Sequence, residues 1–301
     1  MEQTIPITTQ TGGERLGIVA MLVAMALLPA SDAMSKHLAA IYPPEQVAWV
    51  RNAVHAALML PYMIGYRHLL RVSRRRAGMH LLRGVAFVLM TLCYIAALAW
   101  MPLANALAIV FLFPLAVTAV SSVFMGERVG AVRWLAVAVG LCGILLVVRP
   151  GYGPFNPGIG FAIGAALMTA LYILMTRSMS AQTPRGLLLA VPAWIGTIVL
   201  IPVLPWRWTA PAPLDWAMMA AVGGIAALAH FLIIVAYSRA EASAVAPLSY
   251  LQIVFGVLIG ILVFGDVPDA LTTLGIGIVL ASGIVISLRE ARRARTQESA
   301  L

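Results

Sequence analysis

Charge is scarce in this chain. Asp, Glu, Lys and Arg make up 10% of its 301 residues, and apolar residues make up 62%, whereas soluble domains are about one-quarter charged. A water-soluble protein of this length could not bury so much apolar surface, so the composition predicts a membrane protein. The net charge of +9 reflects arginines in short loops, which indicates membrane topology and disfavours a nucleic-acid partner.

Cysteine and the usual enzymatic motifs are also sparse or missing. The two cysteines, Cys93 and Cys142, fall inside apolar runs, which excludes a disulfide framework and a metal-binding spacing. The sequence has no Gly-x-Ser-x-Gly elbow and no phosphate-cradling Gly-Lys motif. An aspartyl protease needs two carboxylates, but only Asp32 lies well inside an apolar segment. We therefore expect neither an enzyme nor an ATP-driven pump, and no cofactor or metal.

Long apolar runs dominate what is present. A helix of about 20 residues crosses the bilayer core, and the sequence predicts an all-α integral membrane protein with ten transmembrane helices. The first run, from Gly17, is too long for a signal-peptide core and is expected to be retained. The predicted segments are 17–37, 46–66, 79–99, 103–124, 131–148, 159–179, 186–205, 215–237, 243–264 and 269–288.

The distribution of arginine predicts the orientation. With a cytoplasmic N-terminus, sixteen arginines fall on the inner side, and only Arg149 and Arg207 fall on the outer side. Positively charged loops favour the cytoplasm. We expect a multi-pass protein of the bacterial inner membrane with both termini cytoplasmic.

An internal repeat divides the chain into two sets of five segments. Gly126-Glu127 and Gly265-Asp266 each precede a last apolar helix, which ends at Arg149 or Arg289. An odd number of spans per copy places the second copy upside down, as in many secondary transporters. The expected parts are a tail at 1–16, a first repeat at 17–149, a linker at 150–157, a second repeat at 158–288 and a tail at 289–301.

The chain resembles the EamA-type group of the drug/metabolite transporter superfamily over about 17–148 and 158–288. The stretch from Ala97 to Arg128 carries small residues, the mid-helix Pro114 and the terminal Gly-Glu. Residues 247–252 (Pro-Leu-Ser-Tyr-Leu-Gln), followed by Gly265-Asp266, match the corresponding helix of the second half. Ile253 stands where proline is frequent, and Asp266 replaces Glu. The resemblance implies ten helices and transport of small organic solutes across an inner membrane.

Three charged residues inside the segments are the first candidates for substrate binding or gating. Lys36 follows Asp32 by one helical turn, and Arg51 lies on the next segment at a similar depth from the outer end. Intramembrane charges are costly and usually functional. They form either an ion pair, Asp32–Lys36 or Asp32–Arg51, that only joins two helices, or a gate that opens when substrate or a proton arrives.

Polar and aromatic residues near mid-depth form a second candidate group. Aromatic walls with a few polar groups suit an organic solute, although single aromatic residues commonly serve packing or the lipid interface. Tyr250 and Gln252 are favoured, because they lie in the motif of the second half. His230 could bind a proton or simply donate to a backbone carbonyl. The group comprises Trp49, Tyr94, His230, Tyr250 and Gln252.

These features predict a secondary transporter that works by alternating access. The resemblance implies export of an amino acid or a related metabolite, with import of a vitamin such as riboflavin as the alternative. A channel and an intramembrane enzyme are less favoured. The expected partners are a small organic solute and the lipid bilayer, with a coupling proton and a homodimer as open alternatives.

Overall fold

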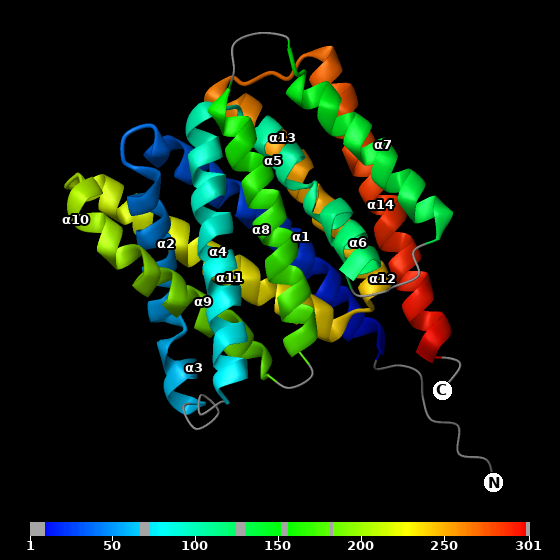
Figure 1. Ribbon diagram of the computed structural model, residues 1–301, viewed down its shortest axis with the longest axis horizontal. Helices are drawn as coiled ribbons and strands as arrows, with labels where there is room; N and C mark the ends of the chain where they lie inside the picture. The colour runs from blue at the N-terminus through cyan, green and yellow to red at the C-terminus, as the bar shows by residue number, and fades with distance from the viewer. Residues whose placement is uncertain (1–9, 67–72, 125–129, 152–155, 181–182, 299–301) are drawn as a thin grey trace.

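A computed structural model describes residues 10–66, 73–124, 130–151, 156–180 and 183–298. Every regular element in these ranges is a helix, and the long helices form one bundle (Figure 1). The α-helices are α1 Gln10–Ala39, α2 Pro44–Leu58, α3 Leu60–Gly65, α4 Arg74–Trp100, α5 Leu103–Val110, α6 Phe113–Phe124, α7 Ala131–Val148, α8 Pro157–Met179, α9 Arg185–Leu200, α10 Leu204–Arg207, α11 Pro213–Arg239, α12 Ala242–Val245, α13 Leu251–Phe264 and α14 Ala270–Glu298. Short 3-10 helices span Ile201–Val203 and Ala246–Tyr250.

Eight helical stretches within the described residues are long and apolar enough to cross a bilayer. The prediction of an all-α membrane protein is therefore confirmed, whereas the count of ten crossings stays a prediction. The two remaining segments are shorter in the structure. The apolar part of α7 covers only Trp134–Val148, and the segment expected at 46–66 is divided between α2 and α3.

Proline explains the division between α2 and α3. Pro61 lies in the first turn of α3 and has no N–H to donate to the preceding turn. The helix is interrupted at Met59, whose own N–H still donates to the carbonyl of His55 at 3.1 Å. Arg51 lies on α2, the longer of the two pieces, so the break leaves the position of this charged residue undisturbed.

A glycine ends α13 and fixes the neighbouring carboxylate. Gly265 adopts a left-handed conformation with φ of 70°, which glycine reaches without steric penalty. Backbone bonds then join Gly265 N to the carbonyl of Ile261 at 3.1 Å and Asp266 N to that of Gly260 at 3.0 Å. The matching dipeptide of the first half, Gly126-Glu127, lies outside the described residues, so the equivalence of the two motifs stays a prediction.

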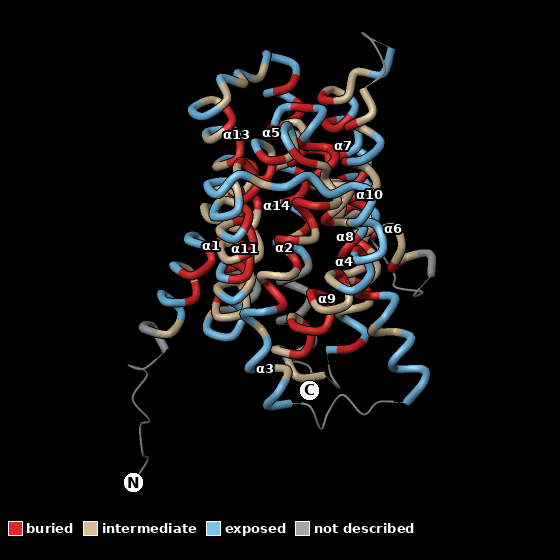
Figure 2. Tube along the Cα trace, turned by 90° about the vertical axis from the view of Figure 1, so that its left-hand side faces the viewer, coloured by how far each residue is buried: buried red, intermediate tan, exposed pale blue. Residues whose placement is uncertain are grey.

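The bundle packs helices of the first half against helices of the second half. Helix α1 lies along α11, α4 along α8, and α7 along α14. The buried residues follow the inner sides of these helices (Figure 2). Because each pairing joins the two predicted repeats, any space at the centre of the bundle has walls from both.

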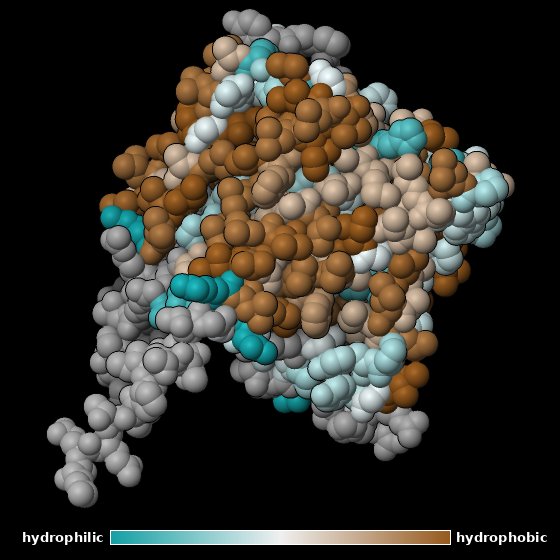
Figure 3. Space-filling model, turned by 180° about the vertical axis from the view of Figure 1, so that it is seen from behind, coloured by the Kyte–Doolittle hydropathy of each residue, from teal (hydrophilic) through white to brown (hydrophobic). Residues whose placement is uncertain are grey.

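The outer surface is largely apolar. Figure 3 shows a broad hydrophobic area on the face opposite to that of Figure 1, with hydrophilic residues mainly toward its edges. Some apolar side chains are almost fully exposed on this surface; that of Leu262, for example, is 81% exposed. A surface of this kind is stable in contact with lipid rather than water. The chain is a multi-pass membrane protein.

Candidate functional site

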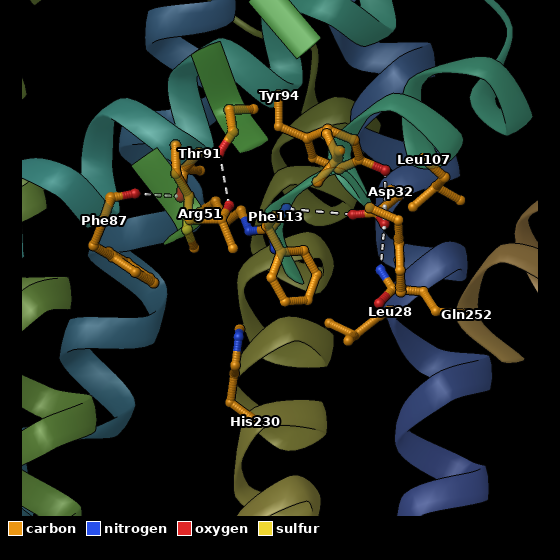
Figure 4. A pocket seen from close by; sticks show the side chains of 15 residues that line it. Leu28, Asp32, Arg51, Phe87, Thr91, Tyr94, Leu107, Phe113, His230 and Gln252 are labelled. Atoms are coloured by element: carbon orange, nitrogen blue, oxygen red, sulfur yellow. Dashed lines mark hydrogen bonds and ion pairs between the residues drawn. The ribbon is translucent and has the colours of Figure 1, made fainter. Parts of the chain in front are cut away.

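A cavity of about 160 Å³ lies inside the bundle, and residues from both halves line it (Figure 4). Its walls come from α1, α2, α4, α5 and α6 of the first half and from α8, α11 and α13 of the second. The apolar lining residues are Leu28, Phe87, Met90, Leu107, Val110, Phe111, Phe113 and Ala165. The polar lining residues are Asp32, Arg51, Thr91, Tyr94, Thr169, His230 and Gln252.

Polar contacts in the cavity converge on Asp32. The hydroxyl of Tyr94 donates to Asp32 Oδ2 at 3.0 Å, and Gln252 Nε2 donates to the same oxygen at 3.4 Å. These two side chains approach the carboxylate from opposite sides (Figure 4). Asp32 is only 2% exposed. Helices α1, α4 and α13 therefore meet at one buried carboxylate, which links the first half to the second.

Arg51 faces Asp32 without closing a hydrogen bond. Its Nη1 lies 3.6 Å from Asp32 Oδ1, a separation that allows Coulomb attraction but is too long for a hydrogen bond. This nitrogen is buried and has no hydrogen-bond partner among the described residues. The guanidinium of this cavity-lining residue therefore keeps a donor without a hydrogen bond, and the carboxylate beside it balances its charge.

Two stacked histidines border the charged pair. The rings of His55 and His230 lie 5.7 Å apart with an interplanar angle of 19°. His230 Nδ1 lies 2.7 Å from the carbonyl of Ala226, and because a carbonyl only accepts, Nδ1 must carry the proton. His230 lines the cavity and points toward Arg51 (Figure 4).

Five of the eight predicted site residues come together in this cavity, and three lie elsewhere. Lys36 is paired with Asp266 rather than with Asp32, which corrects the expected Asp32–Lys36 alternative. Trp49 donates through its indole nitrogen to the carbonyl of Thr197 at 3.1 Å. Tyr250 packs its ring 5.3 Å from that of Phe111 and lies outside the cavity lining.

Several aromatic and hydroxyl side chains that line the cavity were not among the residues predicted from the sequence. Phe111 follows the end of α5, and Phe113 begins α6 directly before Pro114. Pro114 has no N–H to donate to the preceding turn, so the helical hydrogen-bond ladder is interrupted there, and both rings line the cavity. The mid-helix proline was the sequence signal that could have located them.

The hydroxyl groups of the two threonines in the cavity donate hydrogen bonds to backbone carbonyls of their own helices. Thr91 Oγ1 donates to the carbonyl of Phe87 at 2.9 Å, and Thr169 Oγ1 donates to that of Ala165 at 2.7 Å. Each hydroxyl oxygen is then left as an acceptor within the lining. On α4, Phe87, Thr91 and Tyr94 recur at spacings of four and three, so one helix face supplies all three.

The helical bundle and this charged cavity, with walls from both halves, are the features expected of a membrane transport protein. The EamA-like transporter family matches residues 15–149 and 156–288, and the chain belongs to that family. The structure also resembles a solved crystal structure at a TM-score of 0.63 and 19% identity, covering 95% of this chain and 99% of that one. The resemblance to the drug/metabolite transporters is confirmed, as is the expectation of a transporter rather than an enzyme.

Curated relatives carry different solutes. A riboflavin transporter of Vibrio cholerae is 31% identical over 85% of this chain and 87% of its own length. An S-adenosylmethionine uptake transporter of Rickettsia conorii is 26% identical, covering 92% and 94%. The pseudopaline exporter CntI of Pseudomonas aeruginosa is 29% identical, covering 90% and 95%. Small-molecule transport is common to these relatives, whereas solute and direction differ.

Proposed function

We propose that this protein is a secondary carrier for an amino acid or a related zwitterionic metabolite, which it exports by alternating access. The supporting observation is the buried Asp32–Arg51 pair, whose members are 3.6 Å apart and both line the cavity. A solute carboxylate would bind the free donor of Arg51, and a solute ammonium group would bind Asp32. Binding then exchanges one compensated ion pair for two, and no charge is left unpaired in the bilayer.

The apolar lining favours a solute with a hydrophobic side chain. Phe87, Phe111 and Phe113 face the cavity, and aromatic walls with a few convergent polar groups suit organic ligands. Thr169 and Gln252 add neutral hydrogen-bonding groups from the second half. A doubly charged phosphate ester does not fit this proposal, because Asp32 already neutralises Arg51.

Cavity size and charge distinguish the proposed solute from the alternative. The cavity of about 160 Å³ is below the roughly 300–1,000 Å³ of pockets that hold drug-sized ligands. An amino acid fits this scale, whereas riboflavin would require the walls to separate considerably. Riboflavin is also uncharged at neutral pH, so it would give the buried ion pair no direct role. The Vibrio cholerae relative nevertheless makes riboflavin the alternative to test.

The proposed topology completes the carrier. Ten crossings, with the shorter helices α7 and α2–α3 included, would form two inverted sets of five in the bacterial inner membrane with both termini in the cytoplasm. The start of α1 and the end of α14 lie at the same end of the bundle (Figure 1), which supports an even number of crossings. Cavity walls from both halves suit a site that each half exposes in turn.

Counterflow in proteoliposomes tests the proposal. Vesicles loaded with one unlabelled amino acid at a time, or with riboflavin, would be diluted into traces of the same labelled compound. We expect transient, saturable accumulation with at least one apolar amino acid and none with riboflavin. Accumulation of riboflavin alone would favour the vitamin carrier. Flux without saturation or counterflow would indicate a channel and would contradict the proposal.

A further inference from the structure

A second arginine, Arg83, is completely buried in α4. Its Nε donates to Thr176 Oγ1 at 2.8 Å, and its Nη2 donates to the hydroxyl of Tyr172 at 3.4 Å and to the carbonyl of Leu188. The guanidinium also lies over the ring of Tyr172, 5.1 Å from its centre. Arg83 therefore joins α4 of the first half to α8 and α9 of the second.

All of these partners are neutral. No carboxylate lies within ion-pair distance of Arg83 in the part of the chain that the structure describes, and its Nη1 is buried without a hydrogen-bond partner. Arg51 and Lys36, in contrast, each have an aspartate. A buried cation without a counter-charge is expensive in a membrane protein. Such an arginine is able to bind an anion.

One face of α4 connects Arg83 to the central cavity. Phe87 follows Arg83 by one helical turn and lines the cavity. The ring of Phe87 lies 5.4 Å from that of Tyr172, the ring that Arg83 covers. This aromatic pair therefore separates Arg83 from the cavity. Arg83 belongs to the end of α4 nearer its start, which is the end of the bundle where α1 begins and α14 ends (Figure 1).

We propose that Arg83 is a second anion-binding position on the route of the solute, between the central cavity and the end of the bundle that holds both chain termini. Its ligand is a carboxylate, and this assignment rests on the proposed transport of a carboxylate-bearing solute. When α4 separates from α8 and α9, the Phe87–Tyr172 pair opens and Arg83 loses its neutral partners. The solute carboxylate then passes between Arg51 and Arg83, so a cation faces it at both positions.

Thiol modification at Thr176 measures this attraction without a known substrate. The variant T176C would be made in a background where Cys93 and Cys142 are replaced by serine, and studied in detergent so that both ends are accessible. The probes are two methanethiosulfonates, one carrying a sulfonate and one a trimethylammonium group, with rates divided by those for a free thiol. We expect about a tenfold preference for the anionic reagent, because a unit charge a few ångströms away acts through a low dielectric.

Substitution of Arg83 separates the charge from its packing. R83K should retain the preference for the sulfonate, whereas R83Q should reduce the ratio to about one. T169C, two helical turns away on α8 in the central cavity, is the matched control, and its ratio should not change in R83Q. An unchanged ratio at T176C in R83Q would show that Arg83 only joins helices. Failure of either reagent to modify T176C would likewise overturn the proposal, because no solute could then reach the site.

A protection experiment needs no substitution of Arg83 and covers the case in which R83Q does not fold. Sodium benzoate carries a carboxylate on an aromatic ring, and benzamide has the same shape without charge. We expect benzoate at millimolar concentration to slow modification of T176C severalfold and benzamide to have no effect. Equal effects of the two would contradict the anion site. Since neither measurement uses transport, a failure of the counterflow experiment and a failure of this one are distinguishable.

Discussion

Asp32 is the residue at which charge, hydrogen bonding and both halves of the chain meet. It accepts hydrogen bonds from Tyr94 and Gln252 and faces Arg51. The sequence could identify Asp32 and Arg51, because a charged side chain inside an apolar segment is rarely there without a function. The sequence could not assign the partner of Lys36. Asp266 lies 230 positions away, and only the packing of α1 beside α13 brings the two together.

The substitution Asp32→Asn tests the central site. Asparagine keeps the shape and can still accept from Tyr94, so the protein should fold, but Arg51 would lose its counter-charge and a solute ammonium group would lose its anion. We expect transport of the solute identified by counterflow to fall at least tenfold, which corresponds to ~1.4 kcal/mol or more of lost binding or coupling energy.

The matched control for Asp32→Asn is Glu45→Gln. Glu45 also forms an ion pair, with Arg207, but that arginine is 59% exposed, and such pairs contribute about 0–1 kcal/mol. Transport by this variant should stay within about twofold of the parent. Initial rates in proteoliposomes, normalised to the amount of folded protein, compare the two. Parent-like transport by Asp32→Asn would remove Asp32 from the mechanism.

At the scale of the helix, the lengths of the apolar runs predicted most helices, but not where those helices are interrupted. The segment expected at 46–66 is divided at Met59, since the effect of Pro61 on an apolar run depends on local packing. The pairing of helices was also beyond the sequence. Helices α7 and α14 pack together, whereas the repeat marks 131–148 and 269–288 only as equivalent segments and does not predict their contact.

Gly275 controls the approach of α14 to α7. A Cβ atom at Gly275 would lie 2.6 Å from the carbonyl oxygen of Gly143, and a Cβ at Gly143 would lie 2.8 Å from that of Gly275. Backbone atoms cannot move aside as a flexible side chain can. We expect Gly275→Ala to lower the stability of the protein by about 1–3 kcal/mol, the usual effect of overpacking, and to lower its thermal unfolding midpoint in detergent.

Gly277→Ala provides the control on the same helix. No heavy atom lies within 4 Å of a Cβ built at Gly277, and alanine favours helix more than glycine does. The unfolding midpoint of Gly277→Ala should therefore equal or exceed that of the parent. Equal midpoints for the two variants would show that the α7–α14 contact relaxes without loss.

At the scale of the whole molecule, polar links join the two halves at the end of the bundle away from the chain termini. Ion pairs connect Lys36 with Asp266 and Arg149 with Asp269, and the hydroxyl of Tyr42 donates to Asp215 at 2.6 Å. Arg83, nearer the other end, has neutral partners within the described ranges. The sequence placed Arg149 correctly near a helix end, but it did not indicate that these charges would bridge the halves.

The Arg149–Asp269 link should be insensitive to pH over the physiological range. The hydrogen bond from Arg149, with another from the backbone N–H of Thr272, lowers the pKa of Asp269 from 3.8 to about 2. A lowered pKa means that the stabilisation by the ionised form is complete above pH 3.8 and is lost as the pH falls through about 2. The difference in thermal midpoint between the parent and Asp269→Asn should thus be constant from pH 5 to pH 8. A difference that disappears at pH 5 would contradict the assignment.

Removal of both aspartates should open this end of the carrier. The double variant Asp266→Asn, Asp269→Asn abolishes two links between the halves. In the proposed topology this end of the bundle faces outward, so the population in which the cavity is accessible from the outer side should rise. Its reporter is T169C in the cysteine-free background, labelled in intact cells with a membrane-impermeant maleimide. We expect labelling to be several times faster than in the parent. Glu14→Gln makes the same change of charge type near the start of α1, at the opposite end, and should leave the rate unchanged. Equal labelling rates in all three proteins would show that these links do not hold the outer end closed. Slower labelling in the double variant would show that the links form at the inner end, which must close before the cavity opens outward.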